Sequence, residues 1–108
     1  MRRSCLLSLT FLAITFQSAA WAQDAPAPRA GAVVYEADCS NCHSGGFFTG
    51  APKTGDRDDW STLLPKGVDG LTATTIAGIG KMDPRGGCAL CTDAEIRAAV
   101  EHMLQQSQ

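Results

Sequence analysis

The stretch Cys39-Ser40-Asn41-Cys42-His43 has the pattern C-x-x-C-H. Two thiols at this spacing near the end of a helix can both reach the vinyl groups along one edge of a haem. The histidine that follows then points at the iron from one face. The pattern therefore predicts covalent attachment of one haem c through Cys39 and Cys42, with His43 as an iron ligand.

Two other uses of the cysteines compete with this interpretation. A thioredoxin-like redox pair belongs with a βαβ pattern, and no part of the chain alternates with period two for long enough to predict a strand. Cys88-Ala89-Leu90-Cys91 is a second C-x-x-C, and two such pairs can hold a structural zinc ion. The 45 residues between the pairs exceed the usual spacing of about 15–20, and zinc would leave His43 without a role. A four-cysteine zinc-stapled binding domain stays open as an alternative.

The second axial ligand of the iron has three candidates in the chain after residue 22: His102, Met103 and Met82. Met103 lies within the apolar stripe of the last helix and His102 at its polar edge, so packing explains both. Met82 lies between Lys81 and Asp83 in a loop, a setting where functional residues are common. The sequence therefore predicts Met82 as the sixth ligand. Ligation by His and Met fills both axial positions, which favours single-electron transfer over an enzyme reaction.

The pattern of apolar residues predicts an all-α domain of three to five short helices joined by glycine-rich loops. The expected helices cover residues 31–38, 56–64 and 69–79, and the last two are capped by Asp56 and Asp69. Residues 44–55 and 80–87 are expected to be loops because glycine and proline are frequent there.

The last helix has the clearest signals of any predicted element. Thr92 and Glu95 form the T-x-x-E capping box at its start. Arg97 and Glu101 are spaced to pair on its polar face. Its apolar stripe consists of Ile96, Ala99, Val100, Met103 and Leu104.

The first 22 residues have the three parts of a secretory signal: Arg2 and Arg3, an apolar stretch over 6–16, and Ala20-Trp21-Ala22. We expect cleavage after Ala22, export to the periplasm, a flexible leader over 23–30 and a haem domain over 31–108. The apolar stretch is shorter than the roughly 20 residues of a spanning helix, so no stable membrane insertion is expected. An uncleaved anchor is the alternative interpretation.

Composition excludes nucleic acid as a partner. The 108-residue chain has a formal net charge of −2, and loss of Arg2 and Arg3 with the signal would make it −4. No run of Lys or Arg offers a surface for phosphates. A chain of this length forms one domain at most.

Taken together, these motifs resemble the class I c-type cytochromes, and most of all the cytochrome c5 family. The resemblance covers nearly all of the chain after the signal. It is carried by G-x-x-x-Y-x-x-x-C-x-x-C-H from Gly31 to His43, Gly50-Ala51-Pro52-Lys53, Gly55-Asp56, Trp60, Met82-Asp83-Pro84-Arg85-Gly86-Gly87-Cys88-Ala89-Leu90-Cys91 and the last helix from Asp93 to Met103.

The resemblance implies a small fold of helices wrapped around one covalently attached haem. It implies a disulfide between Cys88 and Cys91, and a hydrogen bond from His43 to the carbonyl of Pro52 that orients the imidazole. It also implies that Gly31 allows the first and last helices to cross. Trp60 is expected near the haem edge, although plain core packing explains it equally well. Phe47 and Phe48 are expected to cover the haem or to form part of a docking patch.

The implied function is a soluble periplasmic carrier of single electrons between respiratory redox proteins. By family analogy, the donor is a quinol-oxidising cytochrome complex or a dehydrogenase, and the acceptor is a terminal oxidase. The carrier is expected to be a monomer or weak dimer. Two other roles stay open: a haem subunit of a larger enzyme, and a ligand sensor or enzyme in which Met82 leaves the iron.

Overall fold

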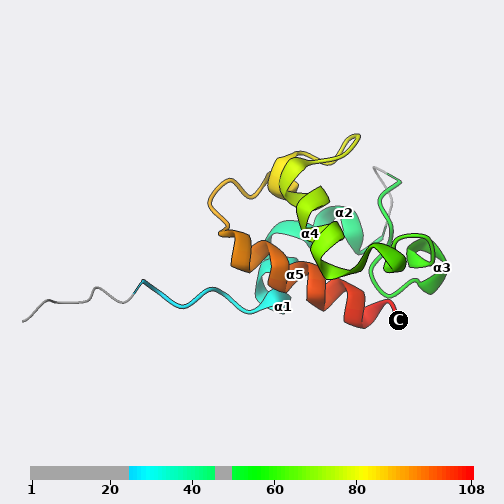
Figure 1. The fold of residues 1–108 in the computed structure, drawn as a ribbon, viewed down its shortest axis with the longest axis horizontal. Coiled ribbons are helices and arrows are strands. Elements are labelled where there is room, and N and C mark those ends of the chain that lie inside the picture. Colours follow the sequence, from blue (N-terminus) through cyan, green and yellow to red (C-terminus); the bar gives the residue numbers. More distant parts are fainter. Residues whose placement is uncertain (1–24, 46–49) are drawn as a thin grey trace, which may run out of the picture.

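The structure is a computed structural model that describes residues 25–45 and 50–108. The expected secretory signal and the pair Phe47 and Phe48 lie outside these ranges. Within them the chain is helical, and its only strand-like pairing is a bridge between Ile79 and Met82. The prediction of an all-α domain with short helices is therefore confirmed (Figure 1).

The first helical run continues without a break from residue 31 to residue 43. It consists of α1 (Gly31–Val34), a widened π-type turn η1 (Tyr35–Cys39) and α2 (Ser40–His43). Because the run is longer than the expected 31–38, the whole C-x-x-C-H pattern lies on helical backbone. Both thiols and the imidazole are thus carried by one element.

The last helix, α5 (Asp93–Gln106), packs against α1 and α4 (Figure 1). Its predicted capping box is present, since the Thr92 side chain accepts from the Glu95 N–H and the Glu95 carboxylate accepts from the Thr92 N–H. Its predicted apolar stripe is also confirmed, because all five of its members are buried. Burial of this stripe against the other helices is what holds α5 in place.

Gly31 lies where α1 meets α5. A Cβ atom on Gly31 would collide with the backbone carbonyl of Ala98, so the two backbones touch at this point. Tyr35, one turn later, packs in the same core as Val100. The crossing at Gly31 that the resemblance implies is therefore present.

The helix expected over 56–64 is shorter than predicted. Asp56 does cap it, accepting from the N–H groups of Asp58 and Asp59, but α3 (Arg57–Trp60) ends after four residues. After Trp60 the backbone hydrogen bonds tighten to the i to i+3 pattern, since the Ser61 N–H donates to the Asp58 carbonyl and the Leu63 N–H donates to the Trp60 carbonyl. The chain passes instead through a turn into the 3₁₀ segment η2 (Leu64–Lys66).

The helix expected over 69–79 is shifted toward the N-terminus. The observed α4 (Gly67–Ala77) places Asp69 in its first turn, where the carboxylate pairs with Arg97 of α5 rather than capping the helix. Arg97 also pairs with Glu101, as predicted. In the segment expected to be a loop, the 3₁₀ turn η3 (Pro84–Gly87) follows Met82. No helix of the described ranges combines the length and apolar character needed to cross a membrane.

Candidate functional site

A cavity of about 410 Å³ lies between the first helical run, α4, the loop over residues 79–87 (the Met82 loop) and α5. Cys39, Cys42, His43 and Met82 all line it, although Met82 is 39 or more residues from the other three. Most of the remaining wall is apolar and comes from Trp60, Leu63, Leu71, Ile79, Ile96, Ala99, Val100 and Met103. The fold thus collects the predicted haem residues around one apolar cavity.

The imidazole of His43 is buried and has a defined orientation. Its Nδ1 lies 2.8 Å from the carbonyl oxygen of Pro52. A carbonyl can only accept, so Nδ1 carries the proton and Nε2 keeps a free lone pair. This is the hydrogen bond that the resemblance implies, and it leaves Nε2 free to bind a metal.

Trp60 holds the segment that contains Pro52. Its indole Nε1–H donates to the carbonyl of Lys53 at 2.8 Å, and its ring centroid lies 6.5 Å from that of His43. Thr54 also donates its N–H to the His43 carbonyl at 2.7 Å. Trp60 is 5% exposed, so it belongs to the core and also lines the cavity.

The three candidates for a second axial ligand differ in position. His102 does not line the cavity; its ring lies 5.3 Å from that of Tyr35 instead. The buried core consists of two clusters, one of Tyr35, Trp60, Leu71, Val100, Met103 and Leu104 and the other of Val34, Cys91, Ile96 and Ala99. Met103 is 6% exposed and belongs to the first core cluster, yet it also borders the cavity. Met82 is half-buried at the cavity wall on a loop outside both core clusters. Two thioethers therefore face the cavity, and sequence reasoning placed only one of them there.

The donor set fits a covalently attached haem. Cys39 and Cys42 are free thiols at the cavity wall, and burial raises the pKa of Cys39 to about 11, assisted by the neighbouring Asp38 carboxylate and by Cys42. Neither thiol is tied up in a disulfide, so both are available to form thioether bonds. With the imidazole nitrogen, a thioether and an apolar wall, the residues offer what a haem requires.

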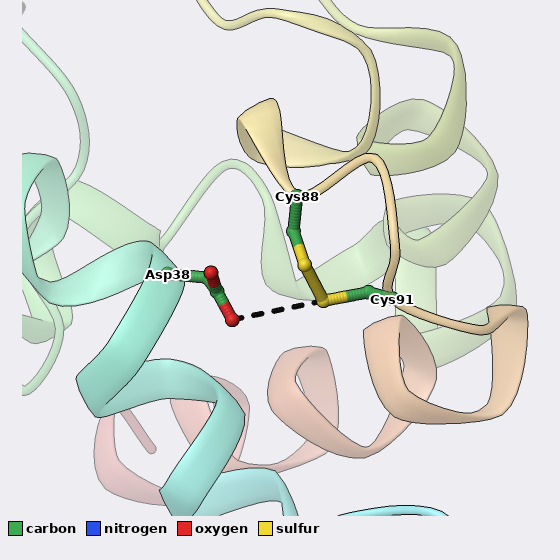
Figure 2. A group of neighbouring side chains, drawn as sticks. All are labelled: Asp38, Cys88 and Cys91. Atoms are coloured by element: carbon green, nitrogen blue, oxygen red, sulfur yellow. Dashed lines mark hydrogen bonds between the residues drawn. A yellow bond between two sulfur atoms is a disulfide. The ribbon is translucent and has the colours of Figure 1, made fainter.

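Cys88 and Cys91 are joined in a disulfide, the pairing that the resemblance implies. Closing so short a loop contributes about 2 kcal/mol of stability in the chain-entropy model. The bond also rules out the four-cysteine zinc alternative in this structure, because two of the four thiolates are used up. Asp38 points toward this disulfide, with Oδ2 3.6 Å from the Cys91 sulfur (Figure 2).

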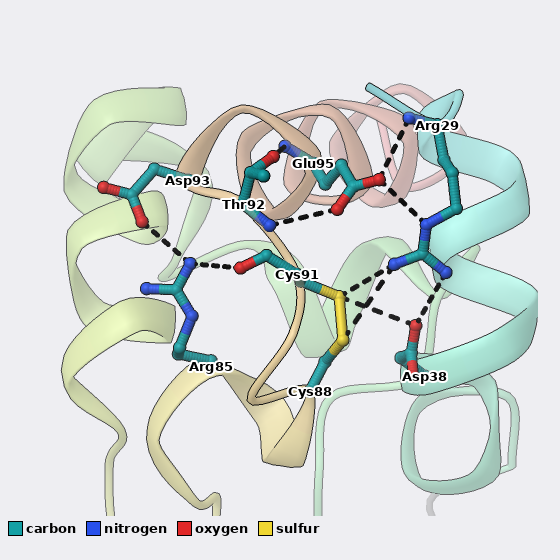
Figure 3. Close-up of a disulfide and its surroundings, with 8 residues drawn as sticks. All are labelled: Arg29, Asp38, Arg85, Cys88, Cys91, Thr92, Asp93 and Glu95. Carbon is teal, nitrogen blue, oxygen red and sulfur yellow. Dashed lines mark hydrogen bonds and ion pairs between the residues drawn. A yellow bond between two sulfur atoms is a disulfide. The ribbon is translucent and has the colours of Figure 1, made fainter. Parts of the chain in front are cut away.

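Arg29 is a structural residue that sequence reasoning missed. Its guanidinium joins Glu95 at 2.8 Å and Asp38 at 3.5 Å, and its Nη2 lies 3.0 Å from the Cys91 sulfur (Figure 3). Arg29, near the end of the expected flexible leader, thus binds η1 through Asp38 and α5 through Glu95. The nearby cation also makes the cluster of Asp38, Cys88 and Cys91 unsuited to a metal ion.

Arg85 anchors the loop that follows Met82. It is the only non-glycine residue of the described ranges with a left-handed backbone, at φ 61°. Such a backbone costs about 1 kcal/mol, and the Arg85 side chain offsets this by donating to the Cys91 carbonyl and to Asp93 (Figure 3). The Met82 loop is therefore tied to the start of α5.

The chain is similar to known c-type cytochromes. The family model described as cytochrome C oxidase, cbb3-type, subunit III, matches residues 26–103. Cytochrome c-555 of Chlorobaculum tepidum is 36% identical over the whole of both chains. Cytochrome c5 of Azotobacter vinelandii is 40% identical, with 69% of this chain and 92% of the relative covered.

A solved structure shows the same fold. The chain matches a component of the crystal structure of an electron transfer complex of nitrite reductase with cytochrome c, with a TM-score of 0.68 and 40% identity. The match covers 72% of this chain and 94% of that one. The family match over residues 26–103 includes every residue that lines the cavity. The chain belongs to this cytochrome c family and, with cytochromes c5 and c-555, to the class I monohaem c-type cytochromes: it binds one covalent haem c with its iron and transfers electrons rather than acting as an enzyme.

Proposed function

We propose that this chain carries single electrons between redox proteins of the periplasm, with Cys39 and Cys42 holding the haem and His43 and Met82 binding its iron. The observation that carries the proposal is the convergence of all four residues on one apolar cavity. When bound there, the haem supplies an iron that alternates between Fe(II) and Fe(III). The apolar wall excludes water, and a thioether ligand favours the reduced state.

The choice of Met82 over Met103 rests on their settings. Met103 is packed in the core with Tyr35, Trp60 and Leu71, and moving it to the iron would open that core. Met82 has no such packing role in the described part of the chain, because it stands outside both core clusters. A loop residue can be placed at the iron without disturbing the helices.

An absorption spectrum of the mature protein tests this ligand set. The oxidised wild type is expected to show a weak sulfur-to-iron charge-transfer band at the long-wavelength end of the visible spectrum (the sulfur-to-iron band). Reduction is expected to sharpen and split the visible absorption bands. Met82→Leu should abolish the sulfur-to-iron band and allow carbon monoxide to bind the reduced protein, because the sixth position opens. Met103→Leu is the matched control: it keeps the apolar volume, so the band should stay while stability falls by less than about 1.5 kcal/mol.

The opposite pattern, with the band lost in Met103→Leu and kept in Met82→Leu, would transfer the ligand role to Met103. Broad high-spin bands in the wild type would instead favour the ligand sensor or enzyme. A protein without visible absorption would contradict the proposed function altogether.

Asp83 is expected to tune the reduction potential. It is exposed at the cavity wall, directly after Met82, where a carboxylate favours Fe(III). Asp83→Asn should therefore raise the midpoint potential by about 20 mV, the effect of one charge at about 10 Å in water. Potentiometric titration at low ionic strength measures the shift, and high salt should reduce it. An unchanged midpoint at low salt would contradict the role of this carboxylate.

The partners are proposed by chemical class. A related cytochrome c forms an electron transfer complex with nitrite reductase, which supports redox enzymes as a class of partner for this chain. A quinol-oxidising complex or dehydrogenase as donor and a terminal oxidase as acceptor fit the same role. The match to a model described as an oxidase subunit favours one second candidate, a haem subunit of a larger enzyme. Co-purification at fixed stoichiometry would support that candidate, whereas a free monomer would support the carrier.

A further inference from the structure

The end of α4 packs against the Met82 loop. The helix α4 ends at its C-cap residue, Gly78. The Gly78 N–H donates to the Thr74 carbonyl at 2.9 Å, and the Gly78 backbone then turns to φ 80°, ψ 157°. This conformation is essentially restricted to glycine. The chain therefore leaves α4 in a direction that another residue would take only under strain.

The backbone of the Met82 loop packs against the bare Cα of Gly78. A Cβ atom there would lie 2.8 Å from the Pro84 nitrogen and 2.9 Å from the Met82 carbonyl oxygen. Both distances are far shorter than ordinary van der Waals contact, and both neighbours are backbone atoms, which cannot rotate away as a side chain would. The space that a side chain would need at Gly78 is thus occupied by the backbone of Met82 and Pro84.

Two hydrogen bonds close the same loop. The Ile79 N–H donates to the Met82 carbonyl at 3.0 Å, and the Met82 N–H donates to the Ile79 carbonyl at 2.9 Å. The Met82 carbonyl is therefore bonded by Ile79 on one side and contacts Gly78 on another. Since α4 itself packs on α5, these contacts connect Met82 to the helical body of the protein.

We propose that Gly78 is a positioning residue that fixes the Met82 segment, and with it the thioether, at the wall of the cavity. The inference rests on the proposed function in that Met82 is the axial ligand. A side chain at position 78 would push the Met82 carbonyl and Pro84 outward and break the pair of hydrogen bonds with Ile79. The thioether would then leave the iron although Met82 itself is intact.

The other end of α4 offers a matched control. Gly67 has nearly the same backbone, at φ 65°, ψ 176°, but a Cβ atom there would meet nothing within 4 Å. Gly67→Ala and Gly78→Ala therefore introduce the same kind of backbone strain, and only Gly78→Ala adds a collision with the Met82 loop. Both variants should unfold at lower temperature than wild type.

The test compares the two holoproteins well below their unfolding temperatures. In Gly78→Ala the sulfur-to-iron absorbance per haem should fall by about half or more, because the collision of the new Cβ with the backbone of Met82 and Pro84 favours the detached arrangement several-fold. In Gly67→Ala the absorbance per haem should equal that of wild type. A full band in Gly78→Ala, or an equal loss in both variants, would overturn the positioning role.

Amide hydrogen exchange separates failure of this inference from failure of the proposed function. If wild type lacks the sulfur-to-iron band, the proposed ligand is wrong, but exchange still reports on the loop. The Ile79 and Met82 amides should then exchange faster in Gly78→Ala and at the wild-type rate in Gly67→Ala. Unchanged exchange at both amides in Gly78→Ala would contradict the inference whatever ligand the iron has.

Discussion

Replacing Gly31 with valine is expected to lower the free energy of unfolding by about 3 kcal/mol, the upper range for overpacking at a closely packed contact. The new Cβ would collide with the backbone carbonyl of Ala98, which no rotation of a side chain can relieve. To make room, α1 must move away from α5. Val34 and Ile96, buried in the same cluster, would then lose their packing.

Urea denaturation of the holoprotein, followed by far-UV circular dichroism, measures this loss. Ala32→Val is the matched control, because Ala32 is exposed on the same helix and the change introduces the same β-branched side chain. Its expected cost is only about 0.5 kcal/mol, from helix propensity alone. Equal midpoints for the two variants would mean that the start of α1 shifts freely and that the contact of Gly31 with Ala98 does not hold the helices together.

Acidification is expected to destabilise the protein through Glu95. Hydrogen bonds from the Arg29 side chain, then from the backbone N–H groups of Thr92 and Arg29, lower the pKa of Glu95 to about 2. A carboxyl with a depressed pKa in the folded state takes up its proton more readily when the chain unfolds. Its contribution to stability is therefore complete above about pH 4.5 and is lost as the pH falls through about 2.

Glu95→Gln should remove this dependence. The amide retains the shape of the side chain but cannot carry the charge that Arg29 requires, so the variant is less stable than wild type at pH 6. The difference between the two proteins should shrink steadily between pH 4.5 and pH 2. Glu101→Gln on the same helix is the control, since it loses only a solvent-exposed pair with Arg97 and should follow the wild-type curve. A Glu95→Gln curve parallel to wild type across this range would refute the role of Glu95.

The element boundaries illustrate where sequence reasoning succeeded and where it failed. The start of α5 was predicted correctly, because Thr92 and Glu95 are three residues apart and form the capping box by themselves. The helix expected over 56–64 is too long, because the apolar spacing does not distinguish an α-helix from the i to i+3 turns that follow Trp60. Local signals were reliable where every partner in the interaction is local.

In the site too, local patterns are predictable from the sequence and long-range contacts are not. C-x-x-C-H was readable because its three functional side chains lie within five residues, and helical spacing alone brings them together. The loop setting of Met82 favours it as a ligand, but the sequence carries no information on its distance from His43. That Met103 also borders the cavity was not predicted, since an apolar stripe does not reveal which of its members face a hollow.

Residues a few positions apart are enough to establish the helical class, the haem attachment motif, the cap of α5 and its buried face. Long-range packing, in contrast, brings Arg29 to Glu95 across 66 residues, Gly31 to Ala98 and Gly78 to Met82. These contacts depend on how whole helices cross and where their connecting turns lead. Helix periodicity specifies which face is buried, but it does not specify which residue of another helix that face will meet.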